Sequence, residues 1–496
     1  DENGTIILEP GIYKEHLNFD KKVKIVGISD SIFEKSSSEL PIVVLDSTQN
    51  CEITATVEIE GVVFTHDEDL YFSNLKKYAE DYSVDSDYEF RFSDPIFMLG
   101  VDCDSKLRNI AVLGAKDYGV ALGKGELTDS ILANCCVNIL CLYDSKIENC
   151  ILGNCREAGI LLLEKANPIV KDCDIRGEGK GICILGNASG SFINCEISGL
   201  CNSLFLDEFS TPSFINCKVL PSLNGSNIKG NSNPILKDCD FLGRGIILEE
   251  NASGTYSNCN IHDIGENHGL KISGSATPSF VDCKIHDNTK YALVYVGETA
   301  NPSFKDCEVY NGMGIYVVDQ ATGTFEGCII HDIGEDNGLQ INGSATPSFA
   351  DCKIHGNKKY ALVSVNGTSN PSLKNCEVYN GAGNSIYVEG QASGTFEGCH
   401  IFDIGENNGL NIQGSATPSF VDCKIHGNTK YALVYVGETA NPSLKNCEVY
   451  KGSGSGIAVE GQARGTYTKC YIHNNKGVNF NNKTSNTIDT STCRME

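Results

Sequence analysis

Residues 283–307 read CKIHDNTKYALVYVGETANPSFKDC, and this interval between two cysteines recurs with variations along most of the chain. Fifteen cysteines return at intervals of 20 to 24 residues. They are Cys150, Cys173, Cys195, Cys217, Cys239, Cys259, Cys283, Cys307, Cys328, Cys352, Cys376, Cys399, Cys423, Cys447 and Cys470. A period of this length predicts a solenoid, in which the chain returns to the same position once per turn.

Two kinds of residue mark the corners of each coil. The residue before the cysteine is Asn, Asp or Gly in fourteen of the fifteen cases, with Lys469 as the exception. These residue types tolerate positive φ, so the chain is expected to bend there. Five residues before the cysteine, from Pro168 onward, stands Pro or Gly, which indicates a second corner.

Short apolar runs separate the corners. Residues 292–296, ALVYV, and residues 314–317, GIYV, are examples, and such turn-bounded runs are typical of strands. The apolar side chain two residues after each cysteine would share the inward face with the thiol. The pattern predicts an all-β fold, a single-stranded right-handed parallel β-helix with three short strands per coil and about 21 coils.

A higher-order repeat organises the second half of the chain. Cys259, Cys328, Cys399 and Cys470 are 69, 71 and 71 residues apart, so three coils form one superrepeat that occurs three times. Residues 283–306 and 423–446 differ at only three of 24 positions. Near-identity of this kind indicates recent duplication, and the surface that these coils display is expected to be periodic too.

The coil rhythm predicts five regions. They are an N-terminal cap with the first coils (1–64), an acidic inserted loop (65–96), irregular coils (97–258), the regular superrepeats (259–473) and a C-terminal cap or tail (474–496). The inserted loop is expected to hold one short helix around residues 75–82. It is read either as a solvated excursion or as a partner-binding arm or lid.

The composition limits the possible partners. Acidic residues outnumber basic ones by 64 to 39, for a formal net charge of −25. Nucleic acid is not expected as a partner, because phosphate contacts need a basic surface. Polyanionic substrates would be repelled unless a cation bridged them. No apolar run approaches 18 residues, so no membrane span is predicted.

The fifteen ladder cysteines are expected to be unpaired. Side chains stacked in register along parallel strands point the same way, whereas a disulfide needs particular Cβ directions. The prediction is a ladder of buried thiols that pack as small hydrophobes. A metal–thiolate column is the alternative, although the chain has no Cys-x-x-Cys pair. Unpaired thiols favour a reducing compartment, the cytoplasm, with a secreted or cell-surface location as the alternative.

Three motifs carry a resemblance to a known repeat group. They are residues 301–307 (NPSFKDC), residues 323–328 (GTFEGC) and the opening 9–15 (EPGIYKE). The chain resembles the carbohydrate-binding and sugar-hydrolase, pectate-lyase-like β-helix group, and most closely the β-helical region of F-box-type adaptors and their bacterial relatives. The resemblance implies a right-handed parallel β-helix, a fold that hosts lyases, hydrolases, epimerases, binding modules and adhesins.

Other marks of that group are missing from the sequence. We find no F-box-like helical segment, no cysteine–histidine zinc cluster, and no match to the paired aspartates of polygalacturonases or the calcium sites of pectate lyases. The resemblance therefore implies the fold rather than a particular activity.

An aromatic or imidazole ring stands three residues after each of the last ten ladder cysteines. These residues are His262, His286, Tyr310, His331, His355, Tyr379, Phe402, His426, Tyr450 and His473. Three interpretations are open: the rings stack on one another, they form an extended platform for a sugar chain or a protein, or the pairs His262/His286 and His331/His355 bind a divalent metal.

Three acidic turns lie beside this column of rings. They contribute Asp263 and Glu266, Asp332 and Glu335, and Asp403 and Glu406, one pair in every third coil. They are read as solvated turns, with calcium coordination and catalytic carboxylates as alternatives. No cofactor is predicted, and calcium is the one candidate.

The outward positions of the strand before the Pro or Gly corner carry no acid pair. They are Lys271, Tyr295, Tyr316, Gln340, Ser364, Tyr387, Asn411 and Tyr435, and general acid–base chemistry needs a perturbed pair in a pocket. The sequence therefore predicts a non-catalytic, elongated binding or scaffolding β-helix that presents its rings and acidic turns to a protein or glycan partner. The alternatives are a pectate-lyase-like lyase or hydrolase acting on a neutral or calcium-bridged glycan, and a structural surface or filament spacer.

Overall fold

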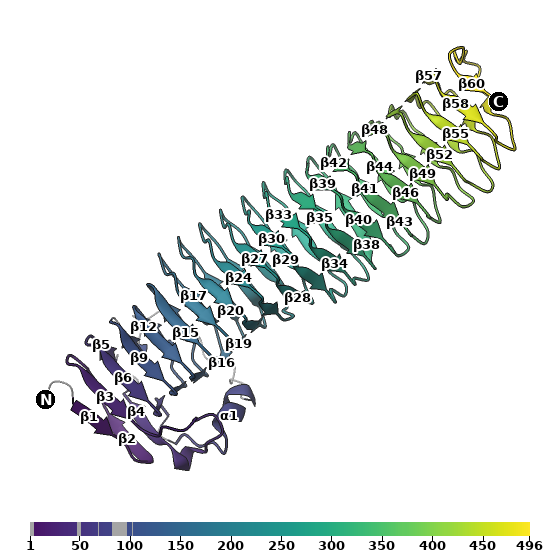
Figure 1. Cartoon of the computed structure of the whole chain (residues 1–496). Coiled ribbons are helices and arrows are strands. Elements are labelled where there is room, and N and C mark those ends of the chain that lie inside the picture. Colours follow the sequence, from purple (N-terminus) through teal and green to yellow (C-terminus); the bar gives the residue numbers. More distant parts are fainter. Residues whose placement is uncertain (1–3, 47–50, 68, 82–96, 102) are drawn as a thin grey trace. The chain divides into compact units, whose positions relative to one another are not determined.

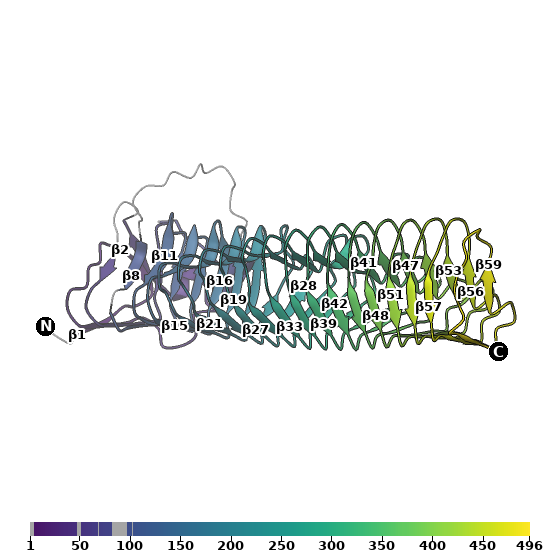
Figure 2. The same ribbon diagram turned by 90° about the horizontal axis from the view of Figure 1, so that it is seen from above.

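The computed structural model describes residues 4–46, 51–67, 69–81, 97–101 and 103–496 (Figure 1). The chain divides into two compact units, unit 1 (1–243) and unit 2 (244–496). Each unit is an all-β solenoid of parallel strands, so the predicted fold class is confirmed. Figure 2 shows the successive turns within each unit from a second direction. In the described part of the chain, no helix is long and apolar enough to span a membrane.

Three short strands make up one coil. The coil that begins after the corner at Pro278 contains β33 (Ser279–Val281), β34 (Lys284–His286) and β35 (Ala292–Val296). Each pairs in parallel with its counterpart in the next coil, β36 (Ser303–Lys305), β37 (Glu308–Tyr310) and β38 (Met313–Val317). Three parallel sheets result, which we call sheets A, B and C in chain order within the coil.

The corner between sheets A and B is the predicted left-handed residue. The residue before every one of the fifteen ladder cysteines has positive φ, from 51° at Asp172 to 65° at Gly398. Lys469 adopts the same conformation, with φ of 54°, although its side chain does not favour it. The position in the coil therefore determines this backbone conformation, even where the residue type does not favour it.

The thiol ladder lies inside the coils. None of the 24 cysteines, all of which the structure describes, forms a disulfide bond, and no ladder cysteine is more than 2% exposed. Each thiol lies near backbone carbonyls: the Sγ of Cys352 is 3.4 Å from the oxygen of Phe325 and 3.3 Å from that of Ala350, and its one S–H can donate to either. Buried rings stack beside the ladder, as in the pair Phe325 and Phe349, whose centroids are 4.4 Å apart. The prediction of a ladder of buried thiols without disulfide bonds is confirmed.

In unit 1 the outward face of sheet B is apolar and covered. Its strands include β4 (Pro41–Leu45), β7 (Val63–Thr65), β10 (Ala111–Leu113), β13 (Ile131–Ala133) and β16 (Ile151–Cys155). Helix α1 (Leu75–Asp81) packs its Leu75 and Ala79 against this face, and Leu40, directly after η1 (Ser37–Glu39), belongs to the same apolar cluster. At Gly153 a Cβ would lie 2.3 Å from the Ala79 carbonyl oxygen, so glycine permits the close approach of α1. The predicted helix around residues 75–82 is thus present, and residues 82–96 of the expected insertion lie outside the described residues.

Candidate functional site

The predicted column of rings forms one continuous stack in unit 2. Each ring is the last residue of a strand of sheet B: β31 (Asn260–His262), β34, β37, β40 (Ile329–His331), β43 (Lys353–His355), β46 (Glu377–Tyr379), β49 (His400–Phe402), β52 (Lys424–His426), β55 (Glu448–Tyr450) and β58 (Tyr471–His473). Centroids of successive rings lie 4.5 to 5.9 Å apart. The side chain of His331 is only 17% exposed. Because neighbouring rings cover each other's faces, chiefly ring edges are open to a partner.

The imidazoles of this column share one hydrogen-bonding pattern. The Nε2 atom faces the first residue of the strand in the preceding coil. In His286 this atom is 3.0 Å from Asn260 Oδ1, and in His331 it is 3.0 Å from Glu308 Oε1. The Nδ1 atom of His331 lies 2.8 Å from Asp332 Oδ2, in the acidic turn. The column and the turns therefore form one polar network.

Two histidines depart from this pattern. For His355, the first residue of the sheet B strand in the preceding coil is Ile329, whose side chain offers no hydrogen bond. Burial lowers the pKa of His355, and the nearby His331 adds to that shift. For His426 the partner is His400, with 2.9 Å between the two Nε2 atoms. Burial lowers the pKa of both these histidines.

The structure gives little support to a metal at the histidine pairs. In His286 and His331, both ring nitrogens already have oxygen or carboxylate partners. Among the described residues, no group of three or more His, Cys, Asp or Glu side chains is close enough to hold a metal ion. A metal would have to compete with these hydrogen bonds with at most two imidazoles as ligands.

The glutamates of the acidic turns belong to clusters that were not predicted from the sequence. Glu266, Glu335 and Glu406 pair with Lys290, Lys359 and Lys430, at 3.1, 3.2 and 3.1 Å. Each lysine Nζ lies over the ring of the next residue, Tyr291, Tyr360 or Tyr431, at 5.7, 5.2 and 5.1 Å from the centroid. These tyrosines are 47%, 53% and 51% exposed. We call these three sets the Glu–Lys–Tyr clusters.

The clusters recur at a constant interval of three coils. At the spacing of parallel strands, successive clusters are about 14 Å apart. The sequence signal was the Lys-Tyr dipeptide, which returns after 69 and then 71 residues. Calcium coordination by these turns is disfavoured, because each glutamate is already paired with an ammonium group.

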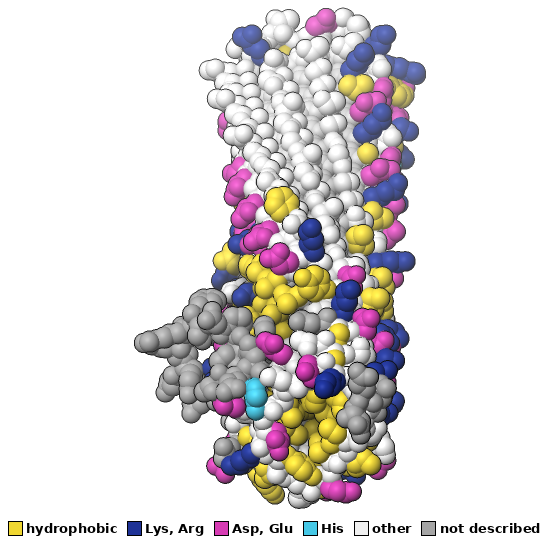
Figure 3. Space-filling view, turned by 90° about the vertical axis from the view of Figure 1, so that its left-hand side faces the viewer, with side chains coloured by type: hydrophobic (Ala, Val, Ile, Leu, Met, Phe, Trp, Pro, Cys, Tyr) yellow, Lys and Arg dark blue, Asp and Glu magenta, His cyan; other side chains and the backbone are white. Residues whose placement is uncertain are grey.

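The remaining surface of unit 2 combines paired charges with an uncharged strip. Lys284, Lys305 and Lys353 pair with glutamates of the next coil at 3.4 to 3.6 Å. The first residue of every strand of sheet A in this unit is Ser or Thr: Thr255, Ser279, Ser303, Thr324, Ser348, Ser372, Thr395, Ser419, Ser443 and Thr466. Figure 3 shows a broad area without charged side chains beside a line of mixed charges. Part of the surface of unit 2 thus carries no charged side chains, although the net charge of the chain is −25.

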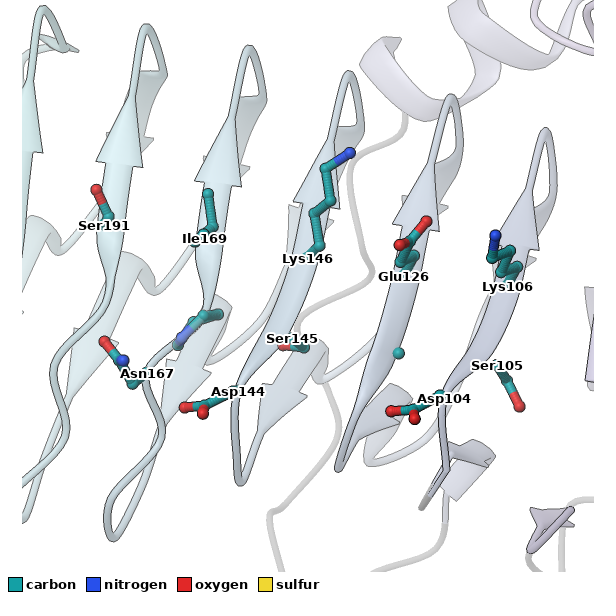
Figure 4. Close-up of a pocket in the computed structure, with 12 residues that line it drawn as sticks. Asp104, Ser105, Lys106, Glu126, Asp144, Ser145, Lys146, Asn167, Ile169 and Ser191 are labelled. Carbon is teal, nitrogen blue, oxygen red and sulfur yellow. The ribbon is translucent and has the colours of Figure 1, made fainter. Parts of the chain in front are cut away.

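Unit 1 holds an open groove on sheet A. It has a volume of about 570 Å³ and crosses β9 (Ser105–Arg108), β12 (Gly125–Thr128), β15 (Ser145–Glu148), β18 (Ile169–Lys171) and β21 (Ser191–Ile193). Lys106, Glu126 and Lys146 are in register on neighbouring strands, and Asp104 and Asp144 precede the outer two (Figure 4). The Lys146 Nζ lies 2.7 Å from Glu148 Oε2. Positive and negative groups therefore alternate along the groove.

This groove was not predicted from the sequence. Its coils are irregular, so no period drew attention to these charges. A usable signal was the tripeptide Asp-Ser-Lys, which occurs at 104–106 and again 40 residues later at 144–146, two coils apart.

Comparison with known proteins identifies the fold of these coils. Residues 118–241, 222–309, 292–449 and 408–495 match the family model described as "Right handed beta helix region". No curated protein sequence matches this chain. Three solved structures are similar in fold. The periplasmic alginate epimerase AlgG has a TM-score of 0.40 and 7% identity, and the match covers 63% of this chain and 77% of AlgG. Bacteriophage CBA120 tailspike protein 3 has a TM-score of 0.37 and 11% identity, over 71% of this chain and 56% of the tailspike. The PL6 family alginate lyase AlyGC has a TM-score of 0.28 and 9% identity, over 100% of this chain and 98% of the lyase.

Proposed function

The chain belongs to the right-handed β-helix family, and on that premise we propose that it is a non-catalytic binding β-helix whose unit 2 holds an extended, largely uncharged glycan. The observation that carries the proposal is the threefold recurrence of the Glu–Lys–Tyr cluster at a fixed interval of three coils. A ligand that repeats along its own length can contact all three clusters at once. Weak individual contacts then combine into a useful affinity.

The chemistry of each cluster suits a sugar ring. The half-exposed tyrosine offers an apolar surface to the C–H groups of a pyranose. The paired carboxylate and ammonium groups beside it can accept hydrogen bonds from hydroxyl groups and donate hydrogen bonds to them. The net charge of −25 disfavours a polyuronate. This role requires no cofactor, and the unpaired thiols favour a reducing compartment for it.

A glycan array with the full chain and variants tests the proposal. The variant with Tyr291→Ala, Tyr360→Ala and Tyr431→Ala should lose at least about tenfold in apparent affinity, because three contact sites are removed together. Tyr143→Ala is the matched control, since Tyr143 is 59% exposed but lies in unit 1 outside any cluster. Absence of any retained glycan, or equal binding by the triple variant and the control, would contradict the proposal.

A second set of substitutions tests the column of rings. His331→Ala, His355→Ala and Tyr379→Ala remove three adjacent rings but leave the tyrosine clusters in place. If the column is itself a contact surface, binding falls in this variant while the melting temperature changes little. If the rings mainly stabilise one another, the melting temperature falls and binding is retained.

The groove in unit 1 favours a second candidate function, an enzyme that acts on a polysaccharide. Asp104, Glu126 and Asp144 line it, and a pair of carboxyl groups is what glycoside hydrolysis uses. Incubation with a panel of neutral polysaccharides, followed by measurement of reducing ends and unsaturated products, tests this candidate. Turnover that disappears with Asp104→Asn and Asp144→Asn would replace the binding proposal with a catalytic one.

A further inference from the structure

A row of three corner residues in unit 1 lies at the edge of the layer that covers sheet B. His66, Gly114 and Asn134 directly follow Thr65, Leu113 and Ala133, which are paired in register in three neighbouring coils. These corners are therefore stacked at the strand spacing of about 4.8 Å. Leu70 and Tyr78 belong to the layer packed against this side of the sheet.

Buried polar atoms in this row have no partner among the described residues. Both ring nitrogens of His66 and both amide atoms of Asn134 are inaccessible to solvent and make no hydrogen bond. Asn134 as a whole is 9% exposed. Native proteins seldom leave such groups unsatisfied, because their loss of hydration is not compensated. A ligand or ordered water that supplies the missing hydrogen bonds is the ordinary resolution.

The space for such a ligand is present beside Asn134. At Gly114 an added Cβ would meet no atom within 4 Å, so the middle corner of the row is open. A pocket of about 160 Å³ lies here, lined by Thr65, Asp67, Leu70 and Tyr78 on one side and by Leu113, Gly114 and Asn134 on the other. The pocket thus combines an aromatic and aliphatic wall with amide, hydroxyl and carboxylate groups.

We propose that this pocket binds one neutral sugar residue. The Asn134 amide can both donate to and accept from sugar hydroxyls, and the Asp67 carboxylate accepts from them. The apolar side of the sugar would lie against Tyr78 and Leu70. This site is in unit 1 and is independent of the Glu–Lys–Tyr clusters of unit 2.

Gly114→Asn is the decisive substitution. Asn134 and Asn154 occupy the same corner in the next two coils with φ of 59° and 42°, so an asparagine is compatible with the φ of 75° at Gly114. Its side chain would fill the open middle of the pocket. Gly427→Asn is the matched control, because Gly427 follows a sheet B strand of unit 2 with φ of 89°, far from this pocket in the sequence.

The test is saturation-transfer NMR and calorimetry on the full chain with a panel of free hexoses, N-acetylhexosamines and glycerol. At least one cyclic sugar should bind the wild-type chain, with affinity reduced at least about tenfold by Gly114→Asn and unchanged by Gly427→Asn. Asn134→Gly, which keeps the left-handed backbone and removes the amide, should also weaken binding and serves if Gly114→Asn does not fold. No binding by any cyclic sugar, which would indicate water as the only occupant, overturns the proposal. The proposal is also overturned if Gly114→Asn binds the sugar as tightly as the wild-type chain. If Gly114→Asn does not fold, wild-type affinity in Asn134→Gly overturns it instead. The triple tyrosine variant should retain this binding, so failure here and failure of the proposed function are distinguishable.

Discussion

At the scale of single residues, the left-handed corner before each ladder cysteine carries most of the information about the fold. Asn, Asp and Gly occupy it because they accept positive φ at little cost. Lys469 shows that the coil imposes this conformation even on a residue that resists it. The coil therefore tolerates a residue that disfavours positive φ at one corner when the same corner of the neighbouring coils carries residues that accept it.

This strain at Lys469 can be relieved by substitution. Lys469→Asn should raise the free energy of unfolding by about 1 kcal/mol, because asparagine adopts the left-handed conformation more readily. Urea denaturation followed by circular dichroism measures the change. Lys445→Asn, at an exposed lysine without positive φ, is the control and should give no gain. A loss of stability in Lys469→Asn would mean that the lysine side chain contributes more than the backbone strain costs.

The accessibility of the thiols gives a second prediction. Only Cys201 is exposed, and Cys103 and Cys493 are half-buried. Burial raises the pKa of Cys51, Cys135 and Cys141 to about 12, so these groups remain thiols at neutral pH and react slowly. Titration with a thiol reagent at pH 8 should label one to three groups in the native chain and all 24 in denaturant. Fast labelling of many thiols in the native chain would contradict the buried ladder.

At the scale of strands and turns, the sequence allows some features to be predicted and conceals others. The column of rings was predictable because all its members stand at the same position after a ladder cysteine. The Glu–Lys–Tyr clusters were not, because Glu266 and Lys290 lie in different coils and meet only through the conformation of their turns. The groove in unit 1 was missed for another reason: Asp104 and Asp144 lie in coils without a strict period.

Three half-buried histidines of unit 2 make its stability depend on pH. Burial lowers the pKa of His355, His400 and His426 in the folded chain, so the unfolded chain binds protons more readily. The stabilisation is present above the unfolded pKa of about 6.5 and is lost as the pH falls below it. The urea concentration at the midpoint of denaturation should therefore be lower at about pH 5.5 than at about pH 7.5.

Two substitutions identify the source of this decrease. The variant with His355→Phe and His426→Phe should show a smaller decrease, and phenylalanine fits the column because Phe402 already occupies it. His16→Phe, at an exposed histidine of unit 1, should leave the decrease unchanged. An equal decrease in the double variant would assign the pH dependence to other groups.

At the scale of the whole molecule, unit 2 is modular. Each coil contacts chiefly its two neighbours, so stability is a sum of coil and interface contributions. The fold could be predicted almost completely from the sequence because every coil repeats the same pattern of short strands and corner residues. Function could not, because the candidate sites arise from differences among coils and from side chains that meet between them.

Removal of one superrepeat tests both the modularity and the proposed multivalent binding. Residues 323–328 and 394–399 have the same sequence, GTFEGC, so deletion of 329–399 joins Cys328 to His400 without changing the corner. The shortened chain should keep its β-type circular dichroism spectrum and cooperative melting, because every remaining coil retains an equivalent neighbour. The deletion removes Glu335, Lys359 and Tyr360 together, leaving two clusters. Apparent affinity for a long glycan should then fall about tenfold or more, while affinity for a short oligosaccharide that reaches one cluster should remain nearly unchanged. If the shortened chain binds the long glycan as tightly as the full chain, the superrepeats are spacers rather than repeated binding sites.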